Sequence, residues 1–384
     1  MSDRPPTIFI SAAEASGDER AGQLVKAIRD RLSSVRVIGV GGEAMAAAGC
    51  EILLDLTHRA SMVGAVVPRL VYYIRTIKRL QKQIREIRPD VHVPVDSPGI
   101  NWHLAAAAKS CGSAVVHYIA PQVWAWAPWR VKKLRRLTDH VACILPFEER
   151  YLWDRGVKAT YIGHPLFDTL PPQAGPLADL VEAWSRGTWR VALLPGSRPA
   201  EIRNHTAALL SASKVIRQRW PDARCTFAAR TPLCAETISR ECNGAEVEIA
   251  VGKTREVLSG SHFAVAVSGT VTLEAAHFGV PMVILYRTNR LGYELIGRWL
   301  LRTPHLSLVN ILAGRRLVPE LMPWHGSHRK LNAMVTELME DLGCLFETRQ
   351  SLIELVRPLR AVPPATAAGN AADLVLDVME RRRT

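Results

Sequence analysis

The sequence has few of the features that mark secreted or membrane-spanning proteins. Its seven cysteines are scattered and form no Cys-x-x-Cys pair beside histidines, so neither a disulfide framework nor a metal site is indicated. Pro121, Gln122 and Pro128 interrupt its most apolar stretch, Ala114–Trp129, which falls short of the roughly 18 clean residues of a spanning helix. The amino terminus lacks the basic-then-apolar order of a signal peptide. These absences predict a cytoplasmic protein without a metal or cofactor.

Acidic residues are also fewer than basic ones. The chain has 49 Lys and Arg against 36 Asp and Glu, a net charge of +13. Such an excess predicts attraction to an anionic partner, which at this point can be nucleic acid, a membrane surface or a phosphorylated substrate. With 384 residues, 48% of them hydrophobic, and a prior of about 150 residues per domain, we expect two or three domains.

Short β-rich runs alternate with helical patterns along most of the chain. Runs that are apolar on both faces, such as those over residues 7–11 and 90–95, are typical of buried parallel strands. A proline-rich passage divides the alternation into two halves. We therefore predict an α/β protein of two Rossmann-like, doubly wound domains facing a central cleft. The predicted segments are residues 1–168, a linker over 169–188, residues 189–343, and C-terminal helices over 344–384.

Ligands of open α/β sheets collect past the carboxyl ends of the strands. Past the first predicted strand, Ser16 and Gly17 lie in a run of small residues where Asp18 is placed to cap the next helix, leaving backbone N–H groups for a ligand. An ordinary turn is the alternative. Past the strand over 90–95, Asp96 is a candidate general base, with a helix cap as the alternative.

One glycine motif suggests a dinucleotide site, but its context argues against it. Gly39–Ala44 reads GVGGEA and formally matches the Gly-x-Gly-x-x-Gly/Ala fingerprint. The fingerprint belongs in the first βα turn with an acid about 20 residues later, and the window around Arg59–Met62 has none. We discount a nicotinamide-dependent enzyme.

The second half offers two turns of the phosphate-binding kind. Gly196–Arg198 follow an apolar strand and combine a turn, a helix N-terminus and an arginine fork suited to a diphosphate. Ser268–Thr270 form another such turn, with Glu274 one helical turn further on. Because Val271 stands three residues before Glu274, a capping box is excluded and a contact to ribose hydroxyls is favoured.

A tryptophan-rich segment precedes a run of cations. Trp124, Trp126 and Trp129 are followed by RVKKLRR over residues 130–136. Such residues can stack bases, line a sugar site or pack beneath a basic helix.

Together, these motifs resemble those of the lipid-A-disaccharide synthase family, glycosyltransferase family 19. AEASGD, VDSP, PQVWAW, LPFE, GHPL, LLPGSRPAEI, SGTVTLE and SLVNILAGR occur in the family's order from Ile8 to Glu320. The resemblance implies a GT-B fold, with a second domain that binds UDP-2,3-diacylglucosamine and a first domain that presents 2,3-diacylglucosamine 1-phosphate. It implies inverting transfer, giving a β-1,6 disaccharide and UDP.

Residue roles follow from the same resemblance. Asp96 matches the family's base. The implied substrate contacts are Ser16, Gly17, Gly196, Ser197, Arg198, Glu201, Ser268, Gly269, Thr270, Glu274 and Asn310. The chain departs from the family at Gly99, where a second acid is common, and at Ala13, Arg20, Val309 and Pro323. These departures bear on the identity of the acceptor.

A basic amphipathic segment over residues 59–88 is the candidate for contact with the inner-membrane surface. Its candidate residues are Met62, Val63, Val66, Val67, Arg69 and Arg75. The alternative is a solvated helix that only covers the sheet, since any such helix is amphipathic.

Two other functions stay open on the residues alone. A GT-B enzyme could act on another UDP-sugar, with a different acceptor or as a UDP-N-acetylglucosamine epimerase. A basic nucleic-acid-binding protein would explain the charge but not the two phosphate-type turns or Asp96, so we expect no nucleic-acid partner. Acyl-chain specificity and a homodimer are left undetermined.

Overall fold

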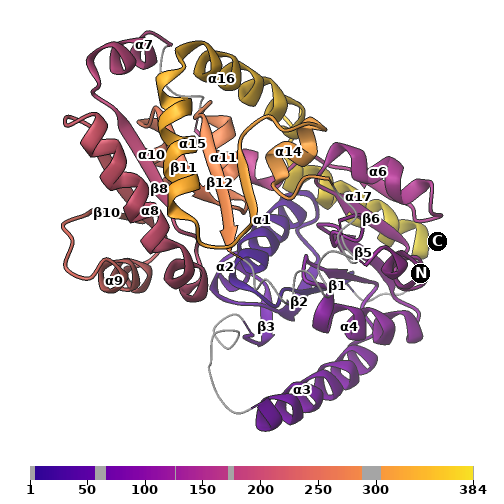
Figure 1. Cartoon of the computed structure of the whole chain (residues 1–384). Helices are drawn as coiled ribbons and strands as arrows, with labels where there is room; N and C mark the ends of the chain where they lie inside the picture. The colour runs from indigo at the N-terminus through magenta and orange to yellow at the C-terminus, as the bar shows by residue number, and fades with distance from the viewer. Residues whose placement is uncertain (1–4, 57–65, 126, 172–176, 288–303, 384) are drawn as a thin grey trace. The chain divides into compact units, whose positions relative to one another are not determined.

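The computed structural model describes residues 5–56, 66–125, 127–171, 177–287 and 304–383. The chain divides into two compact units, which Figure 1 traces from the N-terminus to the C-terminus. Unit 1 comprises Met1–Thr169 and Leu359–Thr384, and unit 2 comprises Leu170–Pro358. The last part of the chain therefore returns to unit 1, and the region predicted as C-terminal helices is shared between the two units.

Unit 1 is built on a parallel sheet with the strand order β3-β2-β1-β4-β5-β6-β7. The order reverses between β1 and β4, which makes their carboxyl ends the switch point where ligands bind in such sheets. The strands are β1 (Thr7–Ser11), β2 (Arg36–Val40), β3 (Glu51–Leu54), β4 (Val91–Pro94), β5 (Ala114–Tyr118), β6 (His140–Cys143) and β7 (Ala159–Tyr161).

Helices cover both faces of this sheet because its central strands are apolar on both sides. In β1, Ile8 and Ile10 belong to one buried cluster and Phe9 to another. α1 and α17 contribute to the first cluster, and α3 and α4 to the second. The helices are α1 (Ala15–Arg31), α2 (Glu43–Ala47), α3 (Val66–Ile87), α4 (Pro98–Ser110), η2 (Pro128–Arg130), α5 (Val131–Leu137), α6 (Pro146–Trp153), η3 (Pro165–Asp168) and α17 (Ala367–Arg383).

The GHPL segment of unit 1 receives the returning chain. His164 N–H donates to the carbonyl of Leu359 at 2.8 Å. The Asp168 carboxylate accepts hydrogen bonds from the N–H groups of Ala367 at 2.9 Å and Ala368 at 3.1 Å, at the start of α17. The sequence of α17 does not indicate where this helix docks. The Asp168 carboxylate helps to fix the place, because it caps the start of α17.

Unit 2 repeats the architecture with the parallel order β10-β9-β8-β11-β12-β13 and a switch point between β8 and β11. Its strands are β8 (Arg190–Leu194), β9 (Arg224–Ala229), β10 (Glu248–Val251), β11 (Phe263–Val267), β12 (Met282–Arg287) and β13 (Glu320–Trp324). Its helices are α7 (Leu177–Arg186), α8 (Pro199–Arg219), α9 (Pro232–Glu241), α10 (Thr254–Ser259), α11 (Val271–His277), α14 (Leu308–Ala313), α15 (His328–Glu340), α16 (Leu342–Val356) and η5 (Arg357–Leu359).

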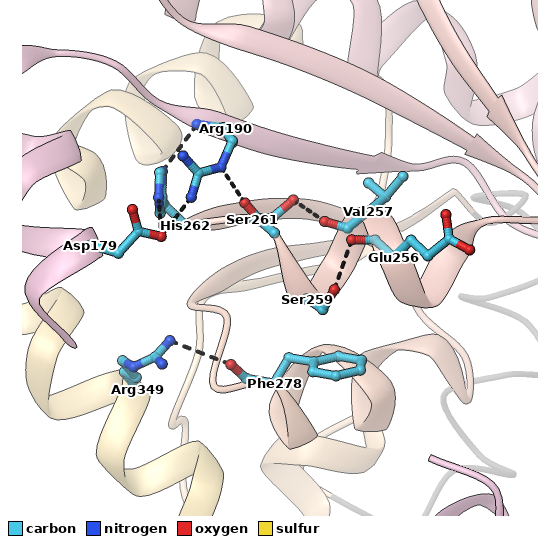
Figure 2. A network of polar contacts seen from close by, with 10 residues as sticks. Asp179, Arg190, Glu256, Val257, Ser259, Ser261, His262, Phe278 and Arg349 are labelled. Atoms are coloured by element: carbon cyan, nitrogen blue, oxygen red, sulfur yellow. Dashed lines mark hydrogen bonds and ion pairs between the residues drawn. The ribbon is translucent and has the colours of Figure 1, made fainter. Parts of the chain in front are cut away.

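Residues predicted as a linker include α7, which is fastened to the sheet of unit 2. Figure 2 shows Asp179 of α7 beside Arg190 and His262, at the amino ends of β8 and β11. The Asp179 carboxylate accepts from Arg190 Nη2 at 2.6 Å and lies 3.2 Å from His262 Nε2, while His262 Nδ1 accepts from the Arg190 N–H at 3.1 Å. This network lies at the opposite ends of these strands from the turns that the sequence predicts to bind phosphate.

Candidate active site

Asp96 lies past the carboxyl end of β4, at the switch point of unit 1, and is half-buried. α4 begins at Pro98 with Ser97 as its N-cap residue, so Asp96 does not occupy the N-cap position that the sequence left as an alternative. Its φ of 54° lies in the left-handed region, which Asp tolerates better than most residues. Such outliers concentrate at functional sites, so the backbone conformation itself marks this position.

The backbone around Asp96 is held by hydrogen bonds from neighbouring strands and α4. Asp96 N–H donates to the carbonyl of Tyr118 at 2.9 Å, and His117 Nε2 lies 3.1 Å from the carbonyl of Asp96. Asn101 Nδ2 donates to the carbonyl of Val95 at 2.8 Å. Sequence reasoning singled out neither His117 nor the role of Asn101. The sequence did contain one signal for His117, because this residue lies on β5, the strand beside β4.

Two buried histidines stand beneath this loop. His92 and His117 are both fully buried, and burial lowers the pKa of His92 to about 3 and of His117 to about 4. Both rings are therefore neutral near pH 7. His92 Nε2 lies 2.9 Å from Ser11 Oγ, which donates to Asn101 Oδ1 at 2.7 Å.

Ser16 and Gly17 lie in the first turn of α1, with Ser16 exposed and Gly17 buried. Glu14 is the N-cap residue and its side chain makes no capping hydrogen bond. As in any α-helix, the N–H groups of the first residues, Ala15–Gly17, lack an intrahelical acceptor, whereas the Asp18 N–H donates to the Glu14 carbonyl at 2.9 Å. The placement agrees with a role in ligand contact, which stays a prediction.

Asp18 does not cap α1 as predicted. It lies inside the first turn of that helix, and its carboxylate reaches α2 instead, accepting from the N–H groups of Gly42 at 2.6 Å, Ala44 at 2.9 Å and Met45 at 3.3 Å. The glycine motif that resembles a dinucleotide fingerprint is therefore filled by a carboxylate of the chain itself. A phosphate would have to displace Asp18, which is a physical reason to discount a dinucleotide there.

The two turns predicted to bind phosphate in unit 2 are brought together by the sheet. β8 and β11 are neighbours, with Leu194 opposite Ala266, so Gly196–Arg198 and Ser268–Thr270 follow adjacent strand ends. A Cβ built on Gly269 would have no heavy atom within 4 Å, so the second turn leaves open space.

The first of these turns does not offer the free amides that the sequence predicted. The Glu201 carboxylate accepts from the N–H groups of Ser197 at 3.1 Å and Arg198 at 3.3 Å, and it pairs with the Arg198 guanidinium at 3.5 Å. A Cβ at Gly196, whose φ is 101°, would stand 2.7 Å from Glu201 Oε2. Glu201 therefore shapes the turn, and the exposed Arg198 side chain stays the predicted contact of this turn for a diphosphate.

Glu274 lies in the first turn of α11 and is largely buried, with 17% of its side chain exposed. Its Oε2 is 3.8 Å from Nε of Arg255 in α10. Sequence reasoning missed Arg255, although it lies shortly past the end of β10, in the kind of position where ligands of such sheets collect.

Asn310 was predicted to contact the substrate, but its amide is used within the chain. Asn310 Oδ1 accepts from the N–H groups of Leu317 at 2.8 Å and Val318 at 3.0 Å. Its Nδ2 donates to the Val318 carbonyl at 2.9 Å and to Glu320 at 3.0 Å. Since an amide offers two donors and about two acceptor positions, this buried side chain is saturated and holds the loop between α14 and β13.

The tryptophan segment is divided between core and surface. Trp124 is buried and donates from Nε1 to Glu148 Oε1 at 2.8 Å, whereas Trp129 is 59% exposed. Trp126 lies outside the described residues. Burial raises the pKa of Glu148 to about 7. Packing thus accounts for Trp124.

Of the predicted membrane residues, Met62 and Val63 lie outside the described residues. Val66, Val67 and Arg69 fall in the first turns of α3, and only their backbone is described; Arg75 is exposed. Further along α3, four consecutive apolar or aromatic residues are 41% to 44% exposed: Val71, Tyr72, Tyr73 and Ile74. Beyond this turn, the helix buries Ile77, Leu80 and Ile84. α3 therefore covers the sheet and also exposes an apolar stretch beyond what that packing uses.

Within the described ranges, no three His, Cys, Asp or Glu side chains gather as a metal-binding group, and none of the helices is long and apolar enough to cross a membrane.

Two Rossmann-like units in succession, each with polar turns at its switch point, define the GT-B class of α/β proteins. Solved structures of that class are similar over the whole chain. The UDP-GlcNAc 2-epimerase of Neisseria meningitidis has a TM-score of 0.60 at 13% identity, covering 98% of this chain and 100% of the other. The calicheamicin glycosyltransferase CalG4 has a TM-score of 0.58 at 13% identity, covering 99% of both.

Sequence relationships identify the family. Residues 8–357 match the family model described as lipid-A-disaccharide synthetase. The lipid-A-disaccharide synthase of Myxococcus xanthus is 34% identical over 379 residues, 98% of each chain, and that of an Anaeromyxobacter species is 36% identical over 366 residues, 92% of this chain and 95% of the relative. The chain belongs to the lipid-A-disaccharide synthetase family, and it is a glycosyltransferase with the GT-B fold, as the motifs predicted.

Proposed function

We propose that this chain transfers 2,3-diacylglucosamine from its UDP derivative to 2,3-diacylglucosamine 1-phosphate, with inversion, giving a β-1,6 disaccharide and UDP for lipid A. The observation that carries the proposal is Asp96, a half-buried carboxylate past β4 at the switch point of unit 1, on a backbone held by its neighbours.

Asp96 is the general base of this mechanism. Its carboxylate accepts the proton of the acceptor hydroxyl as that oxygen bonds to the anomeric carbon of the donor. The bond from that carbon to the diphosphate oxygen breaks on the opposite side, and UDP leaves with the electron pair. Attack opposite the leaving group inverts the anomeric configuration.

Unit 2 holds the donor at its switch point. Arg198, exposed at the start of α8, carries positive charge for the diphosphate, and the turn Ser268–Thr270 supplies backbone and hydroxyl groups beside it. Charge that develops on the leaving diphosphate is thereby stabilised. Glu274, positioned near Arg255, accepts the ribose hydroxyls.

α3 brings the enzyme to the cytoplasmic face of the inner membrane as a peripheral protein. Its exposed stretch Val71–Ile74 lies beside cations such as Arg75 and Lys78, a combination suited to an anionic leaflet. The hydroxyl of Tyr73 stands 3.3 Å from where a Cβ on Gly99 would lie, in the first turn of α4 after Asp96. The end of one side chain of the apolar stretch therefore lies beside the start of the helix that follows the proposed base, which supports delivery of an acylated acceptor from the membrane.

The deciding experiment incubates the protein with UDP-2,3-diacylglucosamine and 2,3-diacylglucosamine 1-phosphate in detergent and identifies the lipid product by mass spectrometry. We expect a tetra-acylated disaccharide monophosphate together with stoichiometric UDP. Release of UDP without that disaccharide, or turnover of UDP-N-acetylglucosamine in the absence of an acceptor, would contradict the proposal.

A further inference from the structure

The two peptide groups that flank the Asp96 Cα are both anchored. In the preceding peptide, the Val95 carbonyl accepts from Asn101 Nδ2 at 2.8 Å and the Asp96 N–H donates to the Tyr118 carbonyl at 2.9 Å. In the following peptide, the Asp96 carbonyl lies 3.1 Å from His117 Nε2. Because peptide groups are planar, holding both planes sets φ and ψ of Asp96, and with them the direction of its Cα–Cβ bond.

This anchoring holds a conformation that the chain would not adopt by itself. The left-handed region costs an L-residue roughly 1–2 kcal/mol, and Asp96 has a φ of 54°. Ile119, just past the neighbouring strand β5, has a φ of 67°, although β-branched residues rarely adopt it. Conformations of this kind persist only where the surroundings determine them. The backbone is strained just past both β4 and β5. This indicates that the surrounding structure fixes the conformation of the Asp96 loop.

The side chains that supply the anchors are oriented in advance. His117 is fully buried, and it must carry its proton on Nε2 in order to donate to a carbonyl. Asn101 is also fully buried, and the hydroxyl of Ser11 donates to its Oδ1 at 2.7 Å, which directs Nδ2 at Val95. Both donors are fully buried and each contacts a backbone carbonyl.

We propose that His117 and Asn101 are positioning residues for the glycosyl transfer: they clamp the peptide groups on either side of Asp96 and so aim its carboxylate at the acceptor hydroxyl. The inference rests on the proposed role of Asp96 as base. A base must be within hydrogen-bond reach of the proton it takes, and misplacement by about 1 Å can cost about 100-fold in rate.

The test compares two substitutions of His117 in the full-length protein. His117→Phe fills the space without a donor, whereas a glutamine side chain in His117→Gln can present an N–H near the position of Nε2. We expect His117→Phe to lower kcat by about 10- to 100-fold with KM for both substrates nearly unchanged, and His117→Gln to recover most of the loss. His140→Phe is the matched control: it removes a histidine that bonds Thr160 from the amino end of β6, away from Asp96.

A double variant separates positioning from general destabilisation. If His117 acts through Asp96, adding His117→Phe to Asp96→Asn causes no further loss of residual turnover. Two results would contradict the positioning role of His117 without contradicting Asp96 as the base. One is that His117→Phe lowers turnover equally in the Asp96→Asn background. The other is that His117→Phe has a normal kcat while Asp96→Asn is inactive. Near-normal turnover of Asp96→Asn overturns the base itself. Should His117→Phe fail to fold, Asn101→Leu removes the other donor and is judged by the same split between kcat and KM.

Discussion

Several carboxylates lie near strand ends. For Asp18, Glu201 and Glu320, the hydrogen bonds show a structural role. Asp18 and Glu201 accept backbone N–H groups at the starts of α2 and α8, where a bound phosphate would otherwise sit. The Glu320 carboxylate accepts hydrogen bonds from the side chains of Ser307 and Asn310. Asp96 instead lies past a strand, one residue before the N-cap of the next helix. Sequence position near a strand end therefore does not by itself separate Asp18 and Glu201, whose carboxylates accept backbone N–H groups, from Asp96, the proposed base.

The first prediction concerns Asp96→Asn. Asparagine also tolerates the left-handed region, so the backbone is kept while the basic oxygen is lost. We expect kcat to fall by about 100- to 10,000-fold, with an unchanged shift in melting temperature on addition of UDP. Asp90→Asn, at the other end of β4, is the control and should retain normal turnover. A catalytically competent Asp96→Asn enzyme would exclude Asp96 as the base.

The second prediction concerns Arg198→Ala. Because Glu201 uses the amides of this turn, we expect the exposed Arg198 guanidinium to make the contact with the diphosphate. We expect UDP to bind about 10- to 100-fold more weakly by calorimetry. Arg186→Ala removes an exposed arginine of the same unit that pairs within α7, and it should not change UDP affinity. An unchanged dissociation constant for Arg198→Ala would remove this residue from the donor site.

The third prediction concerns pH and Glu148. Burial raises its pKa to about 7 in the fold, above the ordinary value of 4.5, so the folded protein binds this proton more tightly than the unfolded chain. The contribution to stability is present below pH 4.5 and is lost as pH rises to about 7. It amounts to about 3 kcal/mol. Urea unfolding should show the wild type losing more stability than Glu148→Gln between pH 4.5 and 7. Parallel pH profiles would contradict this.

At the scale of whole elements, the apolar surface of α3 extends beyond the part that packs in the core. Ile77, Leu80 and Ile84 pack with α4, whereas Val71–Ile74, which span a full turn nearer the start of the helix, are exposed. The sequence left membrane contact and sheet covering as alternatives. In the structure α3 covers the sheet, and its exposed apolar residues also suit contact with a membrane.

The fourth prediction tests that surface. Ile74→Glu should weaken binding to vesicles of phosphatidylethanolamine and phosphatidylglycerol by about 10-fold or more, because it replaces an apolar contact with a negative charge. Turnover of detergent-dispersed substrates should be unchanged. Leu233→Glu, at a similarly exposed apolar residue on α9 of unit 2, is the control. Equal vesicle binding by both variants would argue against α3 as the membrane element.

Edge elements were harder to predict than central ones. Sequence reasoning did not single out β3, β7 and β13, which lie at sheet edges and are only partly buried, so they lack the continuous apolar run that indicated β1. β13 also contains Pro323, which an edge strand tolerates because it need not donate on both sides. Predictions from hydrophobic pattern succeed where a strand is buried on both faces and weaken where burial is partial.

At the scale of the whole molecule, the chain crosses from unit 1 to unit 2 and then returns. α17 packs on α1 and contributes to the buried cluster of unit 1, although it is the last helix of the chain. The core of unit 1 therefore requires α17, which follows all of unit 2 in the sequence.

The fifth prediction follows from this return. Asp168→Ala removes the carboxylate that caps α17 and should destabilise unit 1 by about 1–2 kcal/mol. Hydrogen exchange at the first amides of α17 should accelerate, while UDP affinity stays unchanged because the donor turns belong to unit 2. Asp154→Ala, an exposed surface pair with Arg150, is the control. Unaltered exchange in α17 would contradict the capping role.

Local pattern was sufficient for the alternating α/β architecture, the family and the placement of Asp96 past a strand, because buried parallel strands and the turns after them are short-range features. It could not tell that Asp18 caps α2, that Glu201 fills its own turn, that Asn310 is saturated, or that His117 bonds the backbone of Asp96. Those facts depend on which residues distant in sequence meet at a strand end. A hydrogen bond is decided by distance and direction, and only the folded chain supplies both.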